Sequence, residues 1–193
     1  IFFSSMTVYG SSINQPASEQ SELLPKTGYG LSKKIAEEIL LFHCSQNNMK
    51  ALCLRIPGVF GGKRKSGYIF NTIIKAIKGE KIVLNTENLH YWECIEINDL
   101  CQMVKELIEG MTWSQRFTVL NVGYGEEIDF IETAKKIIKF LKSDSKLVFD
   151  ENKNYSYFYL SVGALRKLIS YRASFNNSLK EYINKIINEL RYR

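Results

Sequence analysis

The sequence is poor in several features that define common protein classes. Among 193 residues it has only 3 prolines, 2 histidines and 4 cysteines. So little proline excludes a collagen-like rod or a proline-rich disordered chain, and a 45% share of hydrophobic residues suits a soluble globular protein. No apolar run is long enough to cross a bilayer, so we expect no membrane partner.

The cysteines and histidines are too scattered to suggest a metal site. No two cysteines have the two-residue spacing of zinc or redox pairs, and the histidines His43 and His90 are far apart. We therefore predict no metal. The cysteines lie in apolar or helical runs, so we expect buried, reduced thiols of a cytoplasmic protein at Cys44, Cys53, Cys94 and Cys101.

Positive charge is in moderate excess. Lysine and arginine exceed aspartate and glutamate by 26 to 20, which gives a formal charge of +6 and a surface that attracts anions such as phosphates. The longest basic cluster, Lys63 to Lys65, lies in a predicted loop. No run resembles a zinc finger, a basic zipper or an aromatic RNA-binding strand, so we expect no nucleic-acid partner.

Strand-like and helix-like segments alternate along the chain, which predicts an α/β fold. The chain opens inside a predicted strand, which is typical of the later part of a longer protein. Strands are expected at 1–3, 51–56, 81–84 and 117–122, and helices at 29–46, 68–78, 98–109, 127–141, 161–168 and 178–190. The polar stretch 143–156 is expected to be a loop around one short strand. The expected capping residues at four of these helix starts are Thr27, Asp99, Asp129 and Ser178.

Tyr29 and Lys33 form a pair on the first predicted helix. Their spacing of four places both side chains on one face, about 40° apart around the axis. An ammonium so placed favours the phenolate and lowers the tyrosine pKa from its reference of about 10, which suits proton exchange with a substrate oxygen. On the opposite face we expect an apolar stripe to pack on the core: Leu31, Ile35, Ile39 and Phe42. The alternative is an ordinary helix with a surface lysine and a half-buried tyrosine.

Upstream of this helix, a strand ends in hydroxyl residues before a turn at Gly10. Polar groups at the ends of sheet strands are where α/β active sites gather. Ser5 is placed to hold a substrate oxygen while Tyr29 moves the proton. The alternative is that these hydroxyls only cap a turn.

Four ordered motifs together resemble the extended short-chain dehydrogenase/reductase family, in its NAD-dependent epimerase/dehydratase group. The match covers roughly 2–140 well and the last fifty residues loosely. The motifs are SSMTVYG at 4–10, PKTGYGLSK at 25–33, LRIPGVFG at 54–61 and NVGYG at 121–125.

The resemblance implies an α/β fold with a Rossmann-type parallel sheet and a smaller substrate-binding lobe. Residues 1–60, with 91–122 returning to them, would belong to a partial dinucleotide-binding domain, and residues 61–90 and 123–193 to the lobe. The implied catalytic residues are Ser5, Tyr29 and Lys33. The implied cofactor-binding residues are Tyr29, Lys33, Ile56, Pro57 and Gly58, and the implied substrate-binding residues are Ser5, Met6, Thr7, Gly58, Arg64 and Trp92.

The implied activity is hydride transfer at a hydroxyl or keto carbon of a sugar, with a nucleotide sugar as substrate and NAD or NADP as cofactor. An epimerase or a ketosugar reductase fits, whereas Met6 and Thr7 stand where 4,6-dehydratases carry an acidic pair. Gly58 and Trp92 replace the asparagine and arginine of many members. The family's glycine-rich first turn is absent from this sequence. The resemblance also implies a homodimer. The alternative is a truncated or non-catalytic relative that binds a nucleotide or nucleotide sugar without turnover.

Overall fold

The computed structural model describes residues 1–10, 16–84, 93–110, 112, 114–148 and 158–191. Its elements alternate between helix and strand, and the strands of its sheets pair in parallel, so the predicted α/β class is confirmed. No helix in these residues is both long and apolar enough to span a bilayer.

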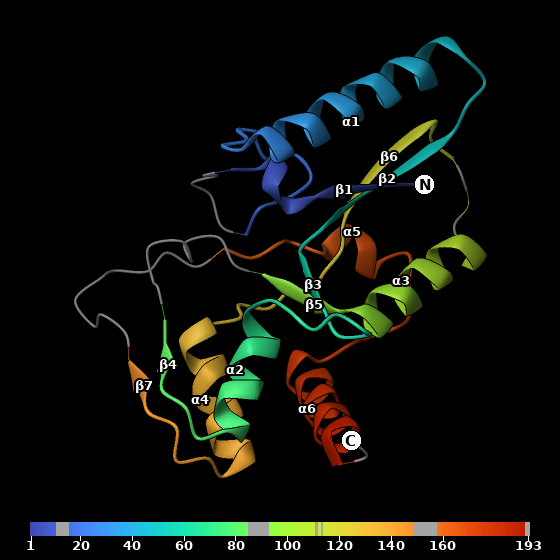
Figure 1. Cartoon of the computed structure of the whole chain (residues 1–193). Helices are drawn as coiled ribbons and strands as arrows, with labels where there is room; N and C mark the ends of the chain where they lie inside the picture. Colours follow the sequence, from blue (N-terminus) through green and yellow to red (C-terminus); the bar gives the residue numbers. More distant parts are fainter. Residues whose placement is uncertain (11–15, 85–92, 111, 113, 149–157, 192–193) are drawn as a thin grey trace.

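A three-stranded parallel sheet carries the first part of the chain. Its order is β1 (Phe2–Ser5), β2 (Ala51–Ile56) and β6 (Phe117–Asn121). Figure 1 shows helix α1 (Gly28–Gln46) above this sheet, and α3 (Ile97–Gly110) and α5 (Gly163–Arg166) below it. The short 3-10 helix η1 (Met6–Val8) follows β1 directly and packs against α1. The carboxyl ends of β1 and β2 therefore lie beside the helix that bears Tyr29.

A second group of elements lies at the other end of the molecule (Figure 1). Strand β3 (Gly58–Phe60) pairs with β5 (Cys94–Glu96), and β4 (Ile82–Val83) pairs with β7 (Leu147–Val148). Helices α2 (Tyr68–Ile77), α4 (Phe130–Leu141) and α6 (Phe175–Arg191) belong to this group, and α2 packs against α4. The division at 60, 90 and 122 into two domains stays a prediction.

Local signals explain most element boundaries. The Thr27 hydroxyl accepts a hydrogen bond from the Gly30 amide at 3.0 Å, and the Asp129 carboxylate accepts one from the Glu132 amide at 2.8 Å, so both predicted caps are confirmed. The cap predicted at Ser178 is wrong, because Ser178 lies inside α6 and its hydroxyl donates to Asp99 at 2.6 Å. Asp99 does lie in the first turn of α3, but its carboxylate accepts hydrogen bonds from side chains of other elements, Tyr124 and Tyr171 among them.

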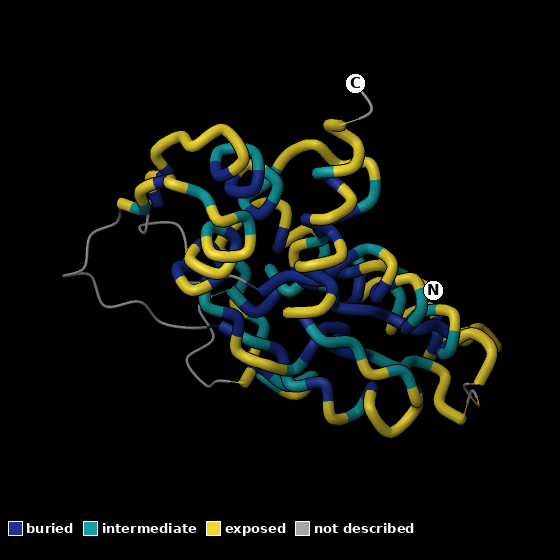
Figure 2. Tube along the Cα trace, turned by 90° about the horizontal axis from the view of Figure 1, so that it is seen from below, coloured by how far each residue is buried: buried dark blue, intermediate teal, exposed yellow. Residues whose placement is uncertain are grey.

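Burial corrects the prediction for the apolar stripe of α1. Buried segments run through the middle of the molecule and exposed ones lie outside (Figure 2). The stripe residues are exposed rather than packed on the core: Leu31 49%, Ile35 46%, Ile39 53% and Phe42 61%. The buried residues of α1 are instead Gly30, Glu37 and Cys44. Helix α1 therefore contacts the sheet through a line of small and polar residues.

All four cysteines are free. Cys44, Cys53 and Cys94 are buried as predicted, whereas Cys101 is exposed. Cys101 lies on α3 at the edge of an apolar hollow, which explains why an apolar sequence context did not bury it.

Candidate active site

At the carboxyl end of β1, the Ser5 hydroxyl oxygen already accepts two hydrogen bonds. Ser5 is the N-cap of η1, and its Oγ accepts from the Thr7 amide at 3.2 Å and from Thr7 Oγ1 at 3.0 Å. A serine oxygen has two lone pairs and one proton. With both lone pairs engaged, the Ser5 hydroxyl can add only a donated hydrogen bond, which suits a carbonyl or alkoxide oxygen.

Helix α1 approaches this strand end closely because residue 30 is glycine. A Cβ atom at Gly30 would lie 2.6 Å from the carbonyl oxygen of Thr7, a distance that real Cβ atoms do not tolerate. The missing side chain thus lets the first turn of α1 rest on η1. Tyr29 is carried on that turn, next to the segment that holds Ser5 and Thr7.

Tyr29 and Lys33 share one face of α1, as predicted. The Tyr29 side chain is exposed, at 57%. Lys33 Nζ lies 5.6 Å from the centroid of the Tyr29 ring and 4.9 Å from that of Phe2, and it donates to the carbonyl oxygen of Phe3 at 2.8 Å. The ammonium is therefore tied to the backbone of β1 beside an accessible phenol.

Strand β2 and the residues that follow it border the same region. Ile56 is the register partner of Ser5, Pro57 is buried and Gly58 is exposed. Ile56 and Phe3 also line a mostly apolar hollow of about 620 Å³, closed on one side by α3. This hollow lies against α3, and neither Tyr29 nor Lys33 is among its lining residues. The accessible phenol and the ammonium beside β1 fit the hydroxyls of a ribose, as in a dinucleotide.

A smaller hollow, of about 120 Å³, brings Gly58 and Arg64 together at the start of α2. Arg64 Nη1 donates to the Val59 carbonyl oxygen at 2.8 Å. The N-cap of α2 is Gly67, which has no side chain to accept hydrogen bonds from the first amides of the helix. Met6 is half-buried beside Ser5. Trp92, the remaining predicted substrate residue, lies outside the described residues.

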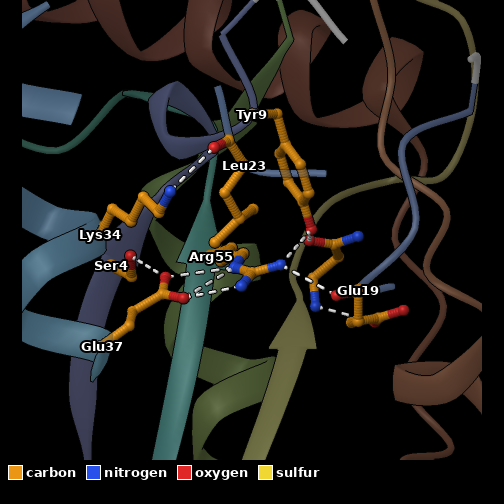
Figure 3. Close-up of polar contacts among 8 residues, drawn as sticks. Ser4, Tyr9, Glu19, Leu23, Lys34, Glu37 and Arg55 are labelled. Carbon is orange, nitrogen blue, oxygen red and sulfur yellow. Dashed lines mark hydrogen bonds and ion pairs between the residues drawn. The ribbon is translucent and has the colours of Figure 1, made fainter. Parts of the chain in front are cut away.

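A buried polar network beneath α1 was not predicted (Figure 3). Arg55 forms a two-pronged ion pair with Glu37, with Nη2 to Oε2 at 2.7 Å and Nε to Oε1 at 3.1 Å. Ser4 donates to the same carboxylate, and Arg55 donates to the Tyr9 hydroxyl at 2.9 Å. Burial raises the pKa of Tyr9 to about 12, so this phenol is neutral and donates in turn to Asn121 Oδ1 at 2.6 Å. The signal in the sequence was an arginine inside the apolar strand 51–56, since a buried charge needs a partner.

Glu93 is a second buried acid that sequence reasoning missed. Its side chain is inaccessible to solvent, and Oε2 accepts a hydrogen bond from the Leu160 amide at 2.6 Å. Oε1 has no hydrogen-bond partner within the described part of the chain and lies where a Cβ atom on Gly123 would clash. Burial raises the pKa of Glu93 well above 4.5, and the negative charge of Glu126 adds to the rise. Burial therefore disfavours the charged form of the Glu93 carboxyl group.

Comparison with known sequences shows to which family the chain belongs. A sequence model of the NAD dependent epimerase/dehydratase family matches residues 1–123. A curated relative, dTDP-4-dehydro-6-deoxyglucose reductase from Escherichia coli, is 36% identical over 143 residues, which are 70% of this chain and 42% of that protein. The chain thus spans less than half of the length of this relative.

Comparison with solved structures agrees on the fold. A UDP-galactose 4-epimerase superposes with a TM-score of 0.77 at 22% identity, covering 98% of this chain and 63% of that one. The UDP-N-acetylglucosamine 4-epimerase from Methanobrevibacter ruminantium M1, in complex with UDP-N-acetylmuramic acid, gives 0.79 at 22%, covering 97% and 62%. The dTDP-glucose 4,6-dehydratase from Bacillus anthracis, in complex with NAD, gives 0.80 at 19%, covering 98% and 62%. The predicted Rossmann-type architecture is thereby confirmed.

Proposed function

Because the chain belongs to the NAD dependent epimerase/dehydratase family, we propose that the whole protein transfers a hydride at a hydroxyl or keto carbon of a nucleotide-linked sugar. Tyr29 is the general acid and base, Lys33 its cationic partner and Ser5 the donor to the reacting oxygen. The observation that carries this proposal is the position of Lys33 Nζ, 2.8 Å from the Phe3 carbonyl oxygen and 5.6 Å from the centroid of the exposed Tyr29 ring.

The proton is moved by Tyr29. When the sugar hydroxyl is oxidised, the phenol oxygen takes its proton, and when a ketone is reduced the phenol returns one. NAD, when bound, accepts or supplies the hydride. The ammonium of Lys33 stabilises the negative charge that develops on the reacting oxygens. When NAD is bound, Lys33 and Tyr29 would hold the hydroxyls of its nicotinamide ribose, and Ile56, Pro57 and Gly58 would contact the nicotinamide.

Ser5 fixes the oxygen that reacts. Its lone pairs accept from Thr7, so its proton is free to be donated to the sugar oxygen. A hydroxyl that only donates favours a substrate oxygen that carries negative charge or a double bond. The sugar oxygen has a double bond in the ketone form of the substrate. Met6 and Thr7 border the sugar from the same strand end, and Thr7 acts mainly by holding Ser5.

The nucleotide diphosphate is bound at the start of α2. Arg64 supplies a guanidinium at the hollow shared with Gly58, and the first amides of α2 supply further donors. Trp92, which lies outside the described residues, remains a predicted contact to the base. Several related structures hold UDP-sugars, including one with UDP-glucose and NAD, which supports this class of substrate.

Both an epimerase and a ketosugar reductase use these steps. The 36% identity over 143 residues to a dTDP-4-dehydro-6-deoxyglucose reductase supports the reductase. The four free cysteines favour a cytoplasmic protein. A homodimer formed through the exposed stripe of α1 completes the proposal.

The experiment uses the whole protein, with any residues that precede Ile1. NADH or NADPH and a panel of UDP- and dTDP-sugars, including a 4-keto-6-deoxy sugar, are followed at the nicotinamide absorbance and by product chromatography. Turnover of a nucleotide sugar is the expected result. Binding of cofactor and sugar by calorimetry, with no turnover of any panel member, would establish instead the non-catalytic relative.

A further inference from the structure

A row of polar side chains crosses the sheet near the carboxyl ends of its three strands. Ser4 on β1, Arg55 on β2 and Asn121 on β6 are register partners, so they point to the same face of the parallel sheet. Glu37 bridges the first two of them and Tyr9 bridges the last two (Figure 3). The result is one continuous buried chain of hydrogen bonds beneath α1.

This row adjoins the proposed site on two elements at once. Ser4 immediately precedes Ser5 on β1. Glu37 follows Lys33 by one helical turn and Tyr29 by two on α1. The link from Ser4 through Glu37 to Arg55 therefore joins the strand that bears the proposed hydrogen-bond donor to the helix that bears the proposed acid and base.

Small and polar residues, rather than the apolar stripe, face the sheet from helix α1. Its buried residues are Gly30, Glu37 and Cys44, and its apolar stripe faces away from the sheet. Two lysine contacts to backbone carbonyls add to the attachment, Lys33 to Phe3 and Lys34 to Leu23. Glu37 is the buried carboxylate at the centre of this line, and both of its oxygens accept from Arg55.

The chemistry of the pair suits orientation better than stability. The side chains of Glu37 and Arg55 are each only 5% exposed. Removing two charges from water costs about as much as their attraction returns, and hydrophobic pairs of similar volume often stabilise a fold as well. A carboxylate gripped by a guanidinium fork, in contrast, fixes distance and direction in a way that apolar contacts do not.

We propose that Glu37 and Arg55 are positioning residues for the reaction. Through the carboxylate they fix the height and rotation of α1 on the sheet, and so the place of the Tyr29 phenol relative to the Ser5 hydroxyl. The inference rests on the proposed function for its catalytic consequence, but its geometric content concerns α1 alone.

The test separates orientation from stability with a matched pair of substitutions. The double variant Glu37→Met/Arg55→Met replaces the ion pair by apolar side chains of similar length. Arg55→Lys keeps both charges but loses the two-pronged contact of the guanidinium. Glu38→Gln, the neighbouring exposed carboxylate on the same helix, is the control. Thermal unfolding, kcat, KM and amide hydrogen exchange across residues 27–36 are measured for each in the whole protein.

We expect the double variant to unfold near the wild-type temperature, to lose about 100-fold in kcat with KM little changed, and to exchange the first turns of α1 faster. If it folds poorly, Arg55→Lys is expected to show the same split between kcat and KM, because the charges remain paired but the two-pronged contact is lost. Wild-type kcat together with wild-type exchange in either folded variant would overturn the proposal. If the wild type turns over no nucleotide sugar, the proposed function fails, while the exchange measurement still decides whether the pair orients α1.

Discussion

Lys33 Nζ donates to the carbonyl oxygen of Phe3 at 2.8 Å, two residues before Ser5 on the same strand. The ammonium is thus anchored to β1 while it lies 5.6 Å from the centroid of the Tyr29 ring. One side chain connects the helix and the strand that carry the proposed chemistry, and its charge is fixed beside the phenol.

Replacing Lys33 by Met is expected to lower kcat/KM by about 100-fold or more, because both the charge beside the phenol and a cofactor contact are lost. Lys34→Met is the matched control, since Lys34 Nζ donates to the Leu23 carbonyl oxygen at 3.1 Å instead. Steady-state kinetics of both variants check this. Equal activity in the two would remove Lys33 from the mechanism.

Thr7→Val is expected to reduce kcat/KM by about three- to tenfold, the equivalent of one neutral hydrogen bond. The substitution keeps the shape of the side chain but frees a lone pair of Ser5, which no longer points its proton steadily at the substrate. Thr7→Ser retains the hydroxyl and is expected to remain close to wild type. If both variants lose activity equally, the hydroxyl of residue 7 is not what orients Ser5.

The raised pKa of Glu93 predicts that the stability of the protein depends on pH. Its pKa in the folded protein is raised well above 4.5 by burial, so at a pH above 4.5 the unfolded chain releases this proton while the folded chain keeps it. The free energy of unfolding should therefore fall as pH rises, by up to about 1.4 kcal/mol per pH unit, until the folded pKa is passed. Denaturant titrations at several values between about pH 5 and pH 8 measure the slope.

Glu93→Gln keeps an acceptor for the Leu160 amide but has no proton to release. Its unfolding free energy is expected to lie above that of the wild type at pH 8 and to approach it at pH 5. Parallel pH profiles for the two proteins would show that Glu93 is not the group responsible.

The exposed stripe of α1 predicts self-association. Ile35 and Ile39 are 46% and 53% exposed, and such contiguous apolar surface marks interaction sites. The double variant Ile35→Asp/Ile39→Asp is expected to convert a dimer to a monomer in light scattering coupled to size exclusion. Lys180→Asp, at an exposed position of α6, serves as the control. A wild-type protein that is monomeric at high concentration would refute the dimer.

Local chemistry made much of the fold predictable. The strand at 51–56 and the helix after Thr27 were foreseen at their observed bounds to within a residue, because an apolar run and a capping hydroxyl are short-range signals. The shared face of Tyr29 and Lys33 followed from helical spacing alone. The four motifs of the resemblance identified the family.

Contacts between distant segments were not predictable in the same way. The apolar period of α1 indicated a core-facing stripe, yet the buried line contains Glu37, whose partners Ser4 and Arg55 lie 33 and 18 residues away. Hydropathy places charged residues at the surface, so it cannot predict that Glu37 is buried by pairing with an arginine of a distant strand. The prediction of Ser178 as a cap is wrong for a similar reason, since its hydroxyl donates to Asp99 on a different helix.

The most direct test of the account is Tyr29→Phe in the whole protein, measured as hydride transfer in a single turnover of bound nucleotide sugar. The substitution removes one hydroxyl from an exposed ring and leaves Lys33 and Ser5 in place. We predict that hydride transfer falls by about 100- to 10,000-fold while calorimetric binding of NAD changes little. Hydride transfer at the wild-type rate would contradict the central claim, that the phenol of Tyr29 moves the proton.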